Sequence, residues 1–199
     1  MLGVSVISVL RSTVCNRGYS PFQTIRKGHR KAGTILLILK AFMIVQIYET
    51  QNCEEAKKLV EVGVDHIGVL VGNGEYPREL GLEQAKDIFR CVTGHAKRVV
   101  LSLSKNLQAI TEIVNKINPH ILHLGTAPES LSPEDVHTLK QQFPNLKIMR
   151  SIPVNDETSV ELAKQYDRVA DYLLLDTQKK DDTQVGARER RTIGASAKR

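Results

Sequence analysis

Hydrophobic positions along the chain gather in short, nearly continuous runs, each followed by a longer segment in which apolar residues recur every three or four positions. The runs are rich in Val, Ile and Leu, a pattern typical of strands that are covered on both faces. The longer segments have the period of helices with one buried side. We predict strands at residues 43–48, 66–71, 98–103, 120–124, 146–152 and 172–175, and helices at 53–62, 82–91, 106–116, 156–165 and from 132 onward.

This alternation of strands and helices predicts an α/β fold with a parallel sheet. The period alone fits both an open doubly wound sheet and a (β/α) barrel. The first strand is not followed by a GxGxxG dinucleotide fingerprint, and the Gly-Asn-Gly turn at 72–74 lacks the third glycine. Polar residues near strand ends (Gln46, Tyr48, His123) favour a barrel, because barrels place active sites at the carboxyl ends of their strands. We therefore expect an incomplete parallel (β/α) TIM-type barrel, with about six of the eight units.

Charge is spread unevenly along the 199 residues, whose formal net charge is +6. Residues 1–42 hold seven basic side chains and no acid, whereas residues 43–187 hold 16 basic and 21 acidic side chains. The central part is therefore acidic, and a folded basic face for nucleic acid is not expected. With 41% hydrophobic and 25% charged residues, the chain has the composition of a single globular domain.

The domain organisation follows from the same shift in composition. Residues 1–42 are a basic N-terminal extension, rich in Ser, Thr, Arg and Gly, with the composition of a mitochondrial or plastid transit peptide. The alternative is non-native sequence ahead of a natural start at Met43. Residues 43–177 are expected to form the partial barrel, and residues 178–199 a polar, basic tail. The expected location is cytoplasmic, or organellar if the extension is a transit peptide.

No membrane, metal or cofactor is expected as a partner. The apolar run at 35–45 is interrupted by Lys40 and is shorter than the roughly 20 residues that span a bilayer. Cys15, Cys53 and Cys91 form no CxxC pair and are odd in number. We therefore expect reduced thiols in an intracellular compartment rather than disulfides or a zinc site.

Four segments, in the right order and spacing, resemble the phosphoribosylanthranilate isomerase family. VQIYETQN and CEEA, at 45–56, match the family's VKICGLTN strand and the helix start that follows it. GVDHIG at 63–68 carries the pattern G-D-x-I-G, and YPRELGLEQA at 76–85 matches the loop S-P-R-x-V-S-P-E-Q-A. DYLLLDT at 171–177 matches D-x-L-L-L-D-S.

The resemblance implies a (β/α) barrel that catalyses an Amadori rearrangement, which is an aldose-to-ketose isomerisation of a phosphoribosylated amine. This reaction needs an acid that protonates the sugar ring oxygen and a base that removes the C2′ proton. The family's acid maps to Asp176. The family's base, a cysteine, maps to Tyr48, and the glycine after it maps to Glu49. A phenol has a reference pKa of about 10, against about 8.5 for a thiol, and is the poorer base near neutrality.

The resemblance also implies two substrate contacts. Arg78 matches the family's substrate-orienting arginine, whose planar fork of donors suits a carboxylate or a phosphate. His123 takes the glutamine position of the family's Q-L-H-G and is expected to bind substrate, while the family's histidine aligns with Gly125. Cys53, five residues past Tyr48, is an alternative base, because a helix N-terminus lowers the pKa of a thiol.

Beyond residue 177 the family continues with G-G-T-G-x-x-F-x-W and two further strands with phosphate-binding loops, whereas this chain reads QKKDDTQVGARERRTIGASAKR. Three hypotheses for function follow. The first is an isomerase of this type in its complete form. The second is a non-catalytic binder of a small anionic or phosphorylated metabolite, and the third a nucleic-acid-associated protein acting through its basic ends. We expect this chain to lack the parent activity and to self-associate through exposed strand edges.

Overall fold

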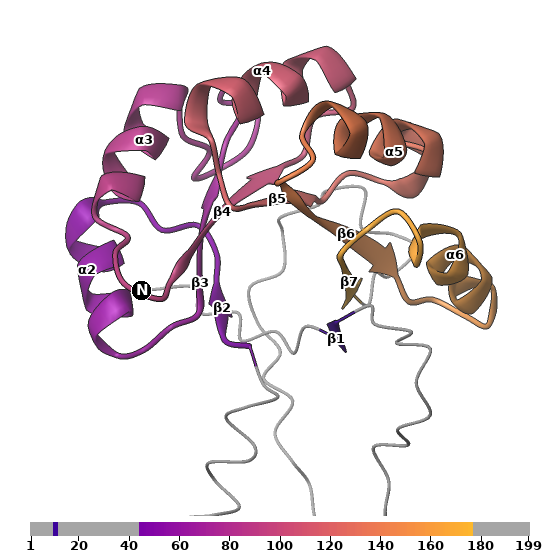
Figure 1. Ribbon diagram of the computed structural model, residues 1–199, viewed down its shortest axis with the longest axis horizontal. Coiled ribbons are helices and arrows are strands. Elements are labelled where there is room, and N and C mark those ends of the chain that lie inside the picture. The colour runs from indigo at the N-terminus through magenta and orange to yellow at the C-terminus, as the bar shows by residue number, and fades with distance from the viewer. Residues whose placement is uncertain (1–9, 12–43, 177–199) are drawn as a thin grey trace, which may run out of the picture.

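The computed structural model describes residues 10–11 and 44–176. Helices cover the outer side of a sheet, and the two layers bend together into an arc (Figure 1). The strands are β1 (Leu10–Arg11), β2 (Gln46–Ile47), β3 (His66–Leu70), β4 (Lys97–Ser102), β5 (Ile121–Leu124), β6 (Lys147–Pro153) and β7 (Tyr172–Asp176). The helices are α2 (Cys53–Glu61), α3 (Leu82–Arg90), α4 (Leu107–Ile117), α5 (Pro133–Gln142), α6 (Thr158–Tyr166) and the short 3-10 helix η1 (Pro128–Ser130).

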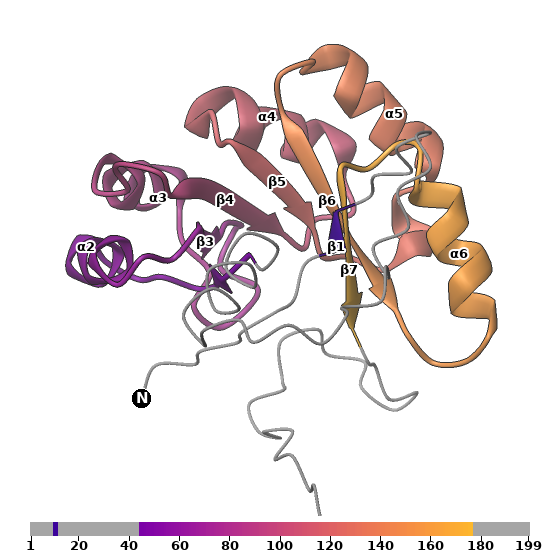
Figure 2. The ribbon, with the colours of Figure 1, turned by 60° about the horizontal axis from the view of Figure 1, so that its bottom comes forward.

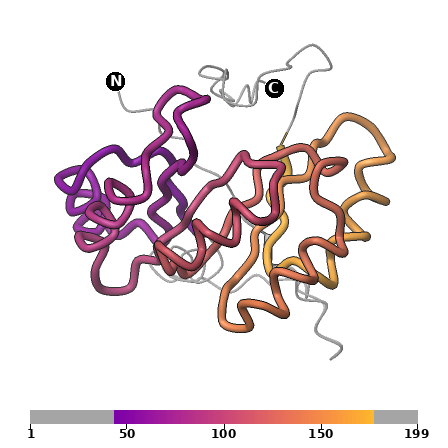
Figure 3. Tube along the Cα trace, turned by 90° about the horizontal axis from the view of Figure 1, so that it is seen from above, coloured from indigo at the N-terminus to yellow at the C-terminus, as the bar shows by residue number. Residues whose placement is uncertain are grey.

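Strands β2 to β7 are parallel and lie in sequence order, each hydrogen-bonded to the next. A helix follows each of β2 to β6, so successive strand-helix units lie side by side (Figure 3). β1 adds to the outer edge of β7 in the antiparallel direction, with Leu10 opposite Leu173 and Arg11 opposite Tyr172. The predicted fold, an incomplete parallel (β/α) barrel, is confirmed, and β1 is an addition that the sequence pattern did not indicate.

The sheet is strongly curled about its concave face (Figure 2). Neighbouring strands lie about 4.8 Å apart, so four strand steps in a flat sheet cover about 19 Å. The Tyr48 hydroxyl, directly after β2, nevertheless lies 3.6 Å from Met149 Sδ on β6, four steps away. The rings of His66 on β3 and Tyr172 on β7, also four steps apart, have centroids separated by 6.0 Å. Side chains from opposite ends of the sheet therefore meet inside the arc.

Both faces of the sheet carry buried apolar side chains, as the near-continuous hydrophobic runs predict. Fully burying a Val, Ile or Leu side chain stabilises a fold by roughly 1.5–3 kcal/mol, so both layers contribute. The main core joins the sheet to its helices and includes the strand residues Ile67, Val69, Val100, Leu122 and Ile148. The smaller cluster on the concave face consists of Val99, Ile121, Met149 and Leu174.

Three helices begin at a polar side chain that caps their free N–H groups. Asn52 accepts a hydrogen bond from the Glu55 N–H in α2, and Ser132 accepts one from the Asp135 N–H in α5. Asn106, predicted as a helical residue, is instead the cap of α4. These local signals explain why these three helices begin within one residue of the predicted positions.

β2 is shorter than the strand predicted at 43–48 and contains two residues. It is an edge strand that pairs with β3 alone among the described residues. The Asp65 side chain holds the backbone at Val45, directly before β2, because its carboxylate accepts the Val45 N–H at 2.8 Å. Glu49 ends the extended segment, since its φ of 56° lies in the left-handed region.

The expectation of reduced thiols is wrong for two of the three cysteines. Cys53 and Cys91 form a disulfide with a Cα–Cα distance of 5.5 Å. It links the first residue of α2 to the C-cap residue of α3, and these helices pack side by side. The residues are 38 positions apart and belong to no cysteine motif, so only the packing of the two helices reveals the pair. Cys53 is therefore not a free thiol that could replace the missing base, and Cys15 lies outside the described residues.

The predicted extension at 1–42, apart from β1, and the predicted tail at 178–199 lie outside the described residues. The edge of β7 expected to be exposed carries β1, whereas the outer edge of β2 has no strand beside it within the described part of the chain. In that part, no helix is long and apolar enough to cross a membrane.

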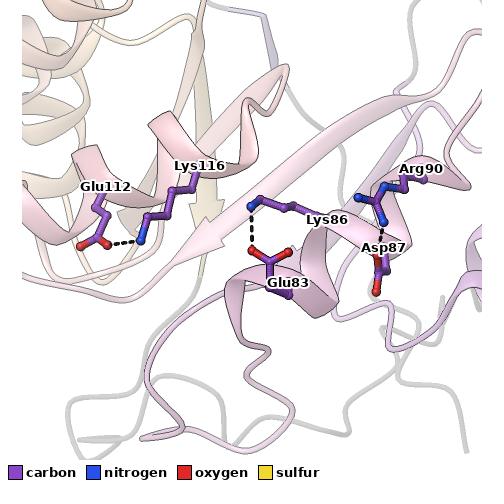
Figure 4. Close-up of polar contacts among 6 residues, drawn as sticks. All are labelled: Glu83, Lys86, Asp87, Arg90, Glu112 and Lys116. Atoms are coloured by element: carbon purple, nitrogen blue, oxygen red, sulfur yellow. Dashed lines mark hydrogen bonds and ion pairs between the residues drawn. The ribbon is translucent and has the colours of Figure 1, made fainter.

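The solvent side of α3 and α4 carries ion pairs between residues three or four positions apart (Figure 4). Exposed pairs of this kind contribute little to stability, because water and salt screen them. They are Glu83–Lys86, Asp87–Arg90 and Glu112–Lys116.

Candidate active site

Polar side chains enter the concave face from strands that are distant in the sheet. Gln46 is fully buried, with its Oε1 within 2.7 Å of His66 Nδ1 and its amide donating to Met149 Sδ at 3.8 Å. Gln46 and Tyr48 lie on the same side of the chain, as residues two apart on a strand must. Met149 thus receives hydrogen bonds from both of them, which ties β6 to the first strand of the barrel.

His123 connects β5 to its neighbours on this face. Its Nε2 lies 2.7 Å from Ser151 Oγ on β6, and its ring centroid lies 5.3 Å from that of Tyr48. Burial, and then the positive charge of Arg150, lower the pKa of His123 to about 3. The imidazole is therefore neutral near pH 7. Its Nδ1 is buried and has no hydrogen-bond partner among residues 44–176.

Tyr48 is the residue to which the resemblance maps the family's catalytic base. Burial, and then the negative charge of Asp176, raise the pKa of the phenol well above its ordinary value. The hydroxyl donates a hydrogen bond to Met149 Sδ. Tyr48 is therefore a neutral phenol over the physiological range, able to donate a hydrogen bond but not to accept a proton from carbon.

Asp176 closes β7 at the same end of the sheet. It pairs in register with Pro153, and its backbone carbonyl accepts the Val154 N–H at 2.7 Å. Its side chain is exposed and near enough to Tyr48 to influence the phenol electrostatically. The structure therefore brings Tyr48, His123 and Asp176, which were identified from the sequence, to one end of the half-barrel.

Arg78 lies on the loop between β3 and α3 and is held by Glu49. Its Nε lies 2.9 Å from Glu49 Oε2, and its Nη2 donates to the Glu49 backbone carbonyl at 2.7 Å. Gln51 closes the arrangement, because its amide donates to the backbone carbonyls of both residues at 3.0–3.1 Å. Arg78 is thus engaged within the chain.

A cavity of about 330 Å³ opens beside this pair. Pockets of this size hold small molecules. Thr50 lines the cavity, is buried, and has a hydroxyl without a hydrogen-bond partner among the described residues. The lining residues are Ile47, Tyr48, Glu49, Thr50, Asn52, Glu54, Glu55, Lys58, Leu59 and Arg78.

Arg150 has a structural role that its sequence position does not reveal. It is fully buried on the helix-facing side of β6, and its Nη1 donates to the carbonyls of Leu124 and Thr126 at 2.7–2.8 Å. Its guanidinium lies over the Tyr166 ring, and the Tyr166 hydroxyl donates to the Leu131 carbonyl at 2.7 Å. The two side chains fix the loop that follows β5, next to His123.

Gly125, which the resemblance aligns with the family's histidine, is closely packed by two leucine side chains. A Cβ there would lie 2.7 Å from Leu101 Cδ1 and 2.9 Å from Leu103 Cδ2, closer than carbon atoms normally approach. A side chain at position 125 would therefore require these two leucine side chains to shift. Among the described residues, no group of three or more His, Cys, Asp or Glu side chains is arranged to hold a metal ion.

Comparisons with known proteins point to one family. No family model matches the chain. The N-(5'-phosphoribosyl)anthranilate isomerase of Rhodopseudomonas palustris is 30% identical over 145 residues, which cover 72% of this chain and 64% of the relative. The isomerase of Methanocella arvoryzae is 31% identical over 134 residues, which cover 67% of this chain and 61% of the relative. The chain therefore spans slightly less than two-thirds of the length of these relatives.

Solved isomerase structures share the fold. The enzyme from Thermus thermophilus gives a TM-score of 0.59 at 18% identity, covering 69% of this chain and 64% of its own. The enzyme from Pyrococcus furiosus gives a TM-score of 0.57 at 23% identity, and the match covers 69% of this chain and 68% of that enzyme. Another, solved with reduced 1-(O-carboxyphenylamino)-1-deoxyribulose 5-phosphate, gives 0.57 at 20% identity, covering 66% and 63%. The sequence matches make the chain a divergent relative of phosphoribosylanthranilate isomerases, and the solved structures show that it shares their fold.

Proposed function

We propose that the carboxyl end of this half-barrel binds a small phosphoribosylated amine or a related phosphorylated metabolite without isomerising it. The sequence relatives are isomerases of phosphoribosylanthranilate, and one solved isomerase holds a compound with a carboxyphenylamino group and a 5-phosphate. Enzymes with this barrel bind their substrates at the carboxyl ends of the strands. In this proposal Arg78 and His123 are the contacts that orient the ligand.

The environment of Tyr48 carries the proposal. An Amadori rearrangement requires a base that removes a proton from carbon. The resemblance maps that base to Tyr48, whose phenol is neutral because burial and the nearby Asp176 raise its pKa. Its hydroxyl is already directed to Met149 Sδ. A ligand would then meet a hydrogen-bond donor where the relatives present a base.

Isomerisation is the second candidate function, and Asp176 favours it. An acid at the end of β7, close to Tyr48, has the place that the family pattern assigns to the catalytic acid. In that case a group other than Tyr48 would remove the C2′ proton, and Asp176 would protonate the ring oxygen.

The two functions are separated by following phosphoribosylanthranilate fluorescence, for binding and for turnover, with the wild-type chain and Tyr48→Cys. We expect the wild type to bind without turnover. Tyr48→Cys should gain turnover, and adding Asp176→Asn should remove it again. Turnover by the wild type that Asp176→Asn abolishes would favour the isomerase. Absence of both binding and reaction in every variant would refute the proposed ligand class.

A further inference from the structure

Glu49 presents to Arg78 the same chemical group that an anionic ligand would present. A guanidinium has five N–H donors in a planar fork that matches a carboxylate. Here Nε faces the Glu49 carboxylate and Nη2 is bonded to the Glu49 backbone carbonyl. The two side chains are about one-third exposed, so an anion from solution can reach the pair and compete with Glu49.

The backbone at both residues is shaped for this contact. Glu49 has a φ of 56° and Arg78 a φ of 66°, in the left-handed region that is unfavourable for residues with a Cβ. Gln51 bridges the two backbone carbonyls, which holds the loops together. Position 49 would be relaxed as glycine, so a glutamate there keeps a strained backbone and adds a carboxylate.

Both cations that line the neighbouring cavity are paired with a carboxylate of the chain. Lys58 is paired with Glu54 at 2.7 Å, as Arg78 is with Glu49. Glu55, the remaining charged side chain of the lining, accepts the Gln51 N–H at 2.8 Å and adds a negative charge. The formal charge of the lining is therefore −1. Its apolar part suits a flat ring, and its charge suits a ring that is uncharged or carries an amine.

We propose that Glu49 is a specificity-determining residue that occupies Arg78 from within the chain, so that the cavity beside Tyr48 accepts an uncharged or amine-bearing ring in preference to a carboxylate. The inference rests on the proposed function in taking this cavity as part of the ligand site. Within the proposed ligand class, it predicts tighter binding of amines whose ring lacks a carboxylate.

The test compares two fluorescent probes, anthranilate and 2-aminobenzamide, which differ in a carboxylate against an amide. The wild type should bind 2-aminobenzamide more tightly. Glu49→Gln should raise the affinity for anthranilate about tenfold and change that for 2-aminobenzamide by less than about twofold. Glu49→Gly, which suits the positive φ, should behave in the same way and guards against a folding defect. Glu83→Gln, on the solvent side of α3, is the matched control and should change neither affinity.

The gain must depend on Arg78. In Glu49→Gln combined with Arg78→Gln, the affinity for anthranilate should return to that of the wild type. Equal affinity of the wild type and both Glu49 variants for anthranilate, including no measurable binding by any of them, would overturn the inference. So would a gain that survives the loss of Arg78. Because the probes carry no ribose phosphate and the readout is affinity, failure here is distinct from failure to bind phosphoribosylanthranilate.

Discussion

The rings of Tyr48 and His123 lie 5.3 Å apart, centroid to centroid, although three strand steps separate β2 from β5. Such a contact requires the sheet to curl, since three steps in a flat sheet cover about 14 Å. On its other side His123 meets Ser151 on the adjacent strand. The curl therefore surrounds this histidine with protein and keeps it uncharged.

The buried histidine should make stability fall in mild acid. The pKa of His123 is lowered to about 3, whereas an unfolded histidine has a pKa of about 6.5. Below about pH 6.5 the unfolded state therefore binds a proton that the folded state does not, and stability present above that pH is lost as the pH falls. The loss should approach about 1.4 kcal/mol per pH unit, measured by urea unfolding between pH 7 and pH 5.

A glutamine at position 123 keeps an amide that can bond to Ser151 and removes the titrating ring. His123→Gln should therefore flatten the pH dependence, although it lowers stability at pH 7. The same change at His95, whose side chain is exposed, is the control and should leave the dependence as in the wild type. A His123→Gln variant with the wild-type slope would show that another group causes the acid sensitivity.

Asp171 should stabilise the chain above the pH at which its carboxylate titrates. Burial raises its pKa, but hydrogen bonds from Lys140, the Ile148 N–H and Lys147 outweigh burial, and the pKa is lowered overall. Asp171→Asn should cost about 1.5–3 kcal/mol at pH 7. Because the unfolded carboxyl has a pKa of about 3.9, the difference from the wild type should shrink as the pH falls through 4. Urea midpoints at pH 7 and pH 3 test this, and a constant difference would contradict it.

Reduction of the disulfide between Cys53 and Cys91 should weaken the fold. Closing a loop of 38 residues is worth about 3–4 kcal/mol through the unfolded state. The unfolding midpoint should therefore fall when a reductant is added, and Cys91→Ser should have the lower midpoint with or without reductant. Cys15→Ser should respond to reductant like the wild type. Three free thiols in the untreated, denatured protein would refute the pairing.

Asp65 should hold the first strand of the barrel in place. Removing its carboxylate leaves the Val45 N–H without its partner, which costs about 1–3 kcal/mol when the group is shielded from water. Asp65→Ala should lose roughly that stability and exchange the amide hydrogens around β2 faster. Glu112→Ala, which breaks an exposed pair on α4 (Figure 4), should change stability by less than about 0.5 kcal/mol. Equal effects of the two substitutions would argue against a special role of Asp65.

The layout of the barrel was predictable because its signals are local. HIGVLV is an apolar run bounded by polar residues, and it forms β3 with one residue of difference. Since the carboxyl ends of parallel strands lie along one edge, Tyr48, His123 and Asp176 could be assigned to a common end from their positions alone. The pKa shifts of Tyr48 and His123 could not, because burial depends on the curl of the whole sheet.

The contacts that distinguish this chain come from loops that are remote in sequence. Glu49 and Arg78 lie 29 positions apart, and their pairing depends on two left-handed backbone positions that no pattern of residue types reveals. The bond between Cys53 and Cys91 depends on how α2 packs on α3. Arg150 lies within an apolar strand, and only the register decides that it faces the helices rather than the concave side.

The pairing of β1 with β7 has a consequence for the order of folding. Every other strand pair joins consecutive units, whereas this one joins residues 10 and 11 to residues 173 and 172. Contacts between remote residues form late, because closing a long loop costs entropy before the contact stabilises it. The six parallel strands can therefore assemble one unit at a time as the chain emerges from the ribosome. The first strand of the sequence is then the last to join the sheet, and its pairing with β7 completes the fold.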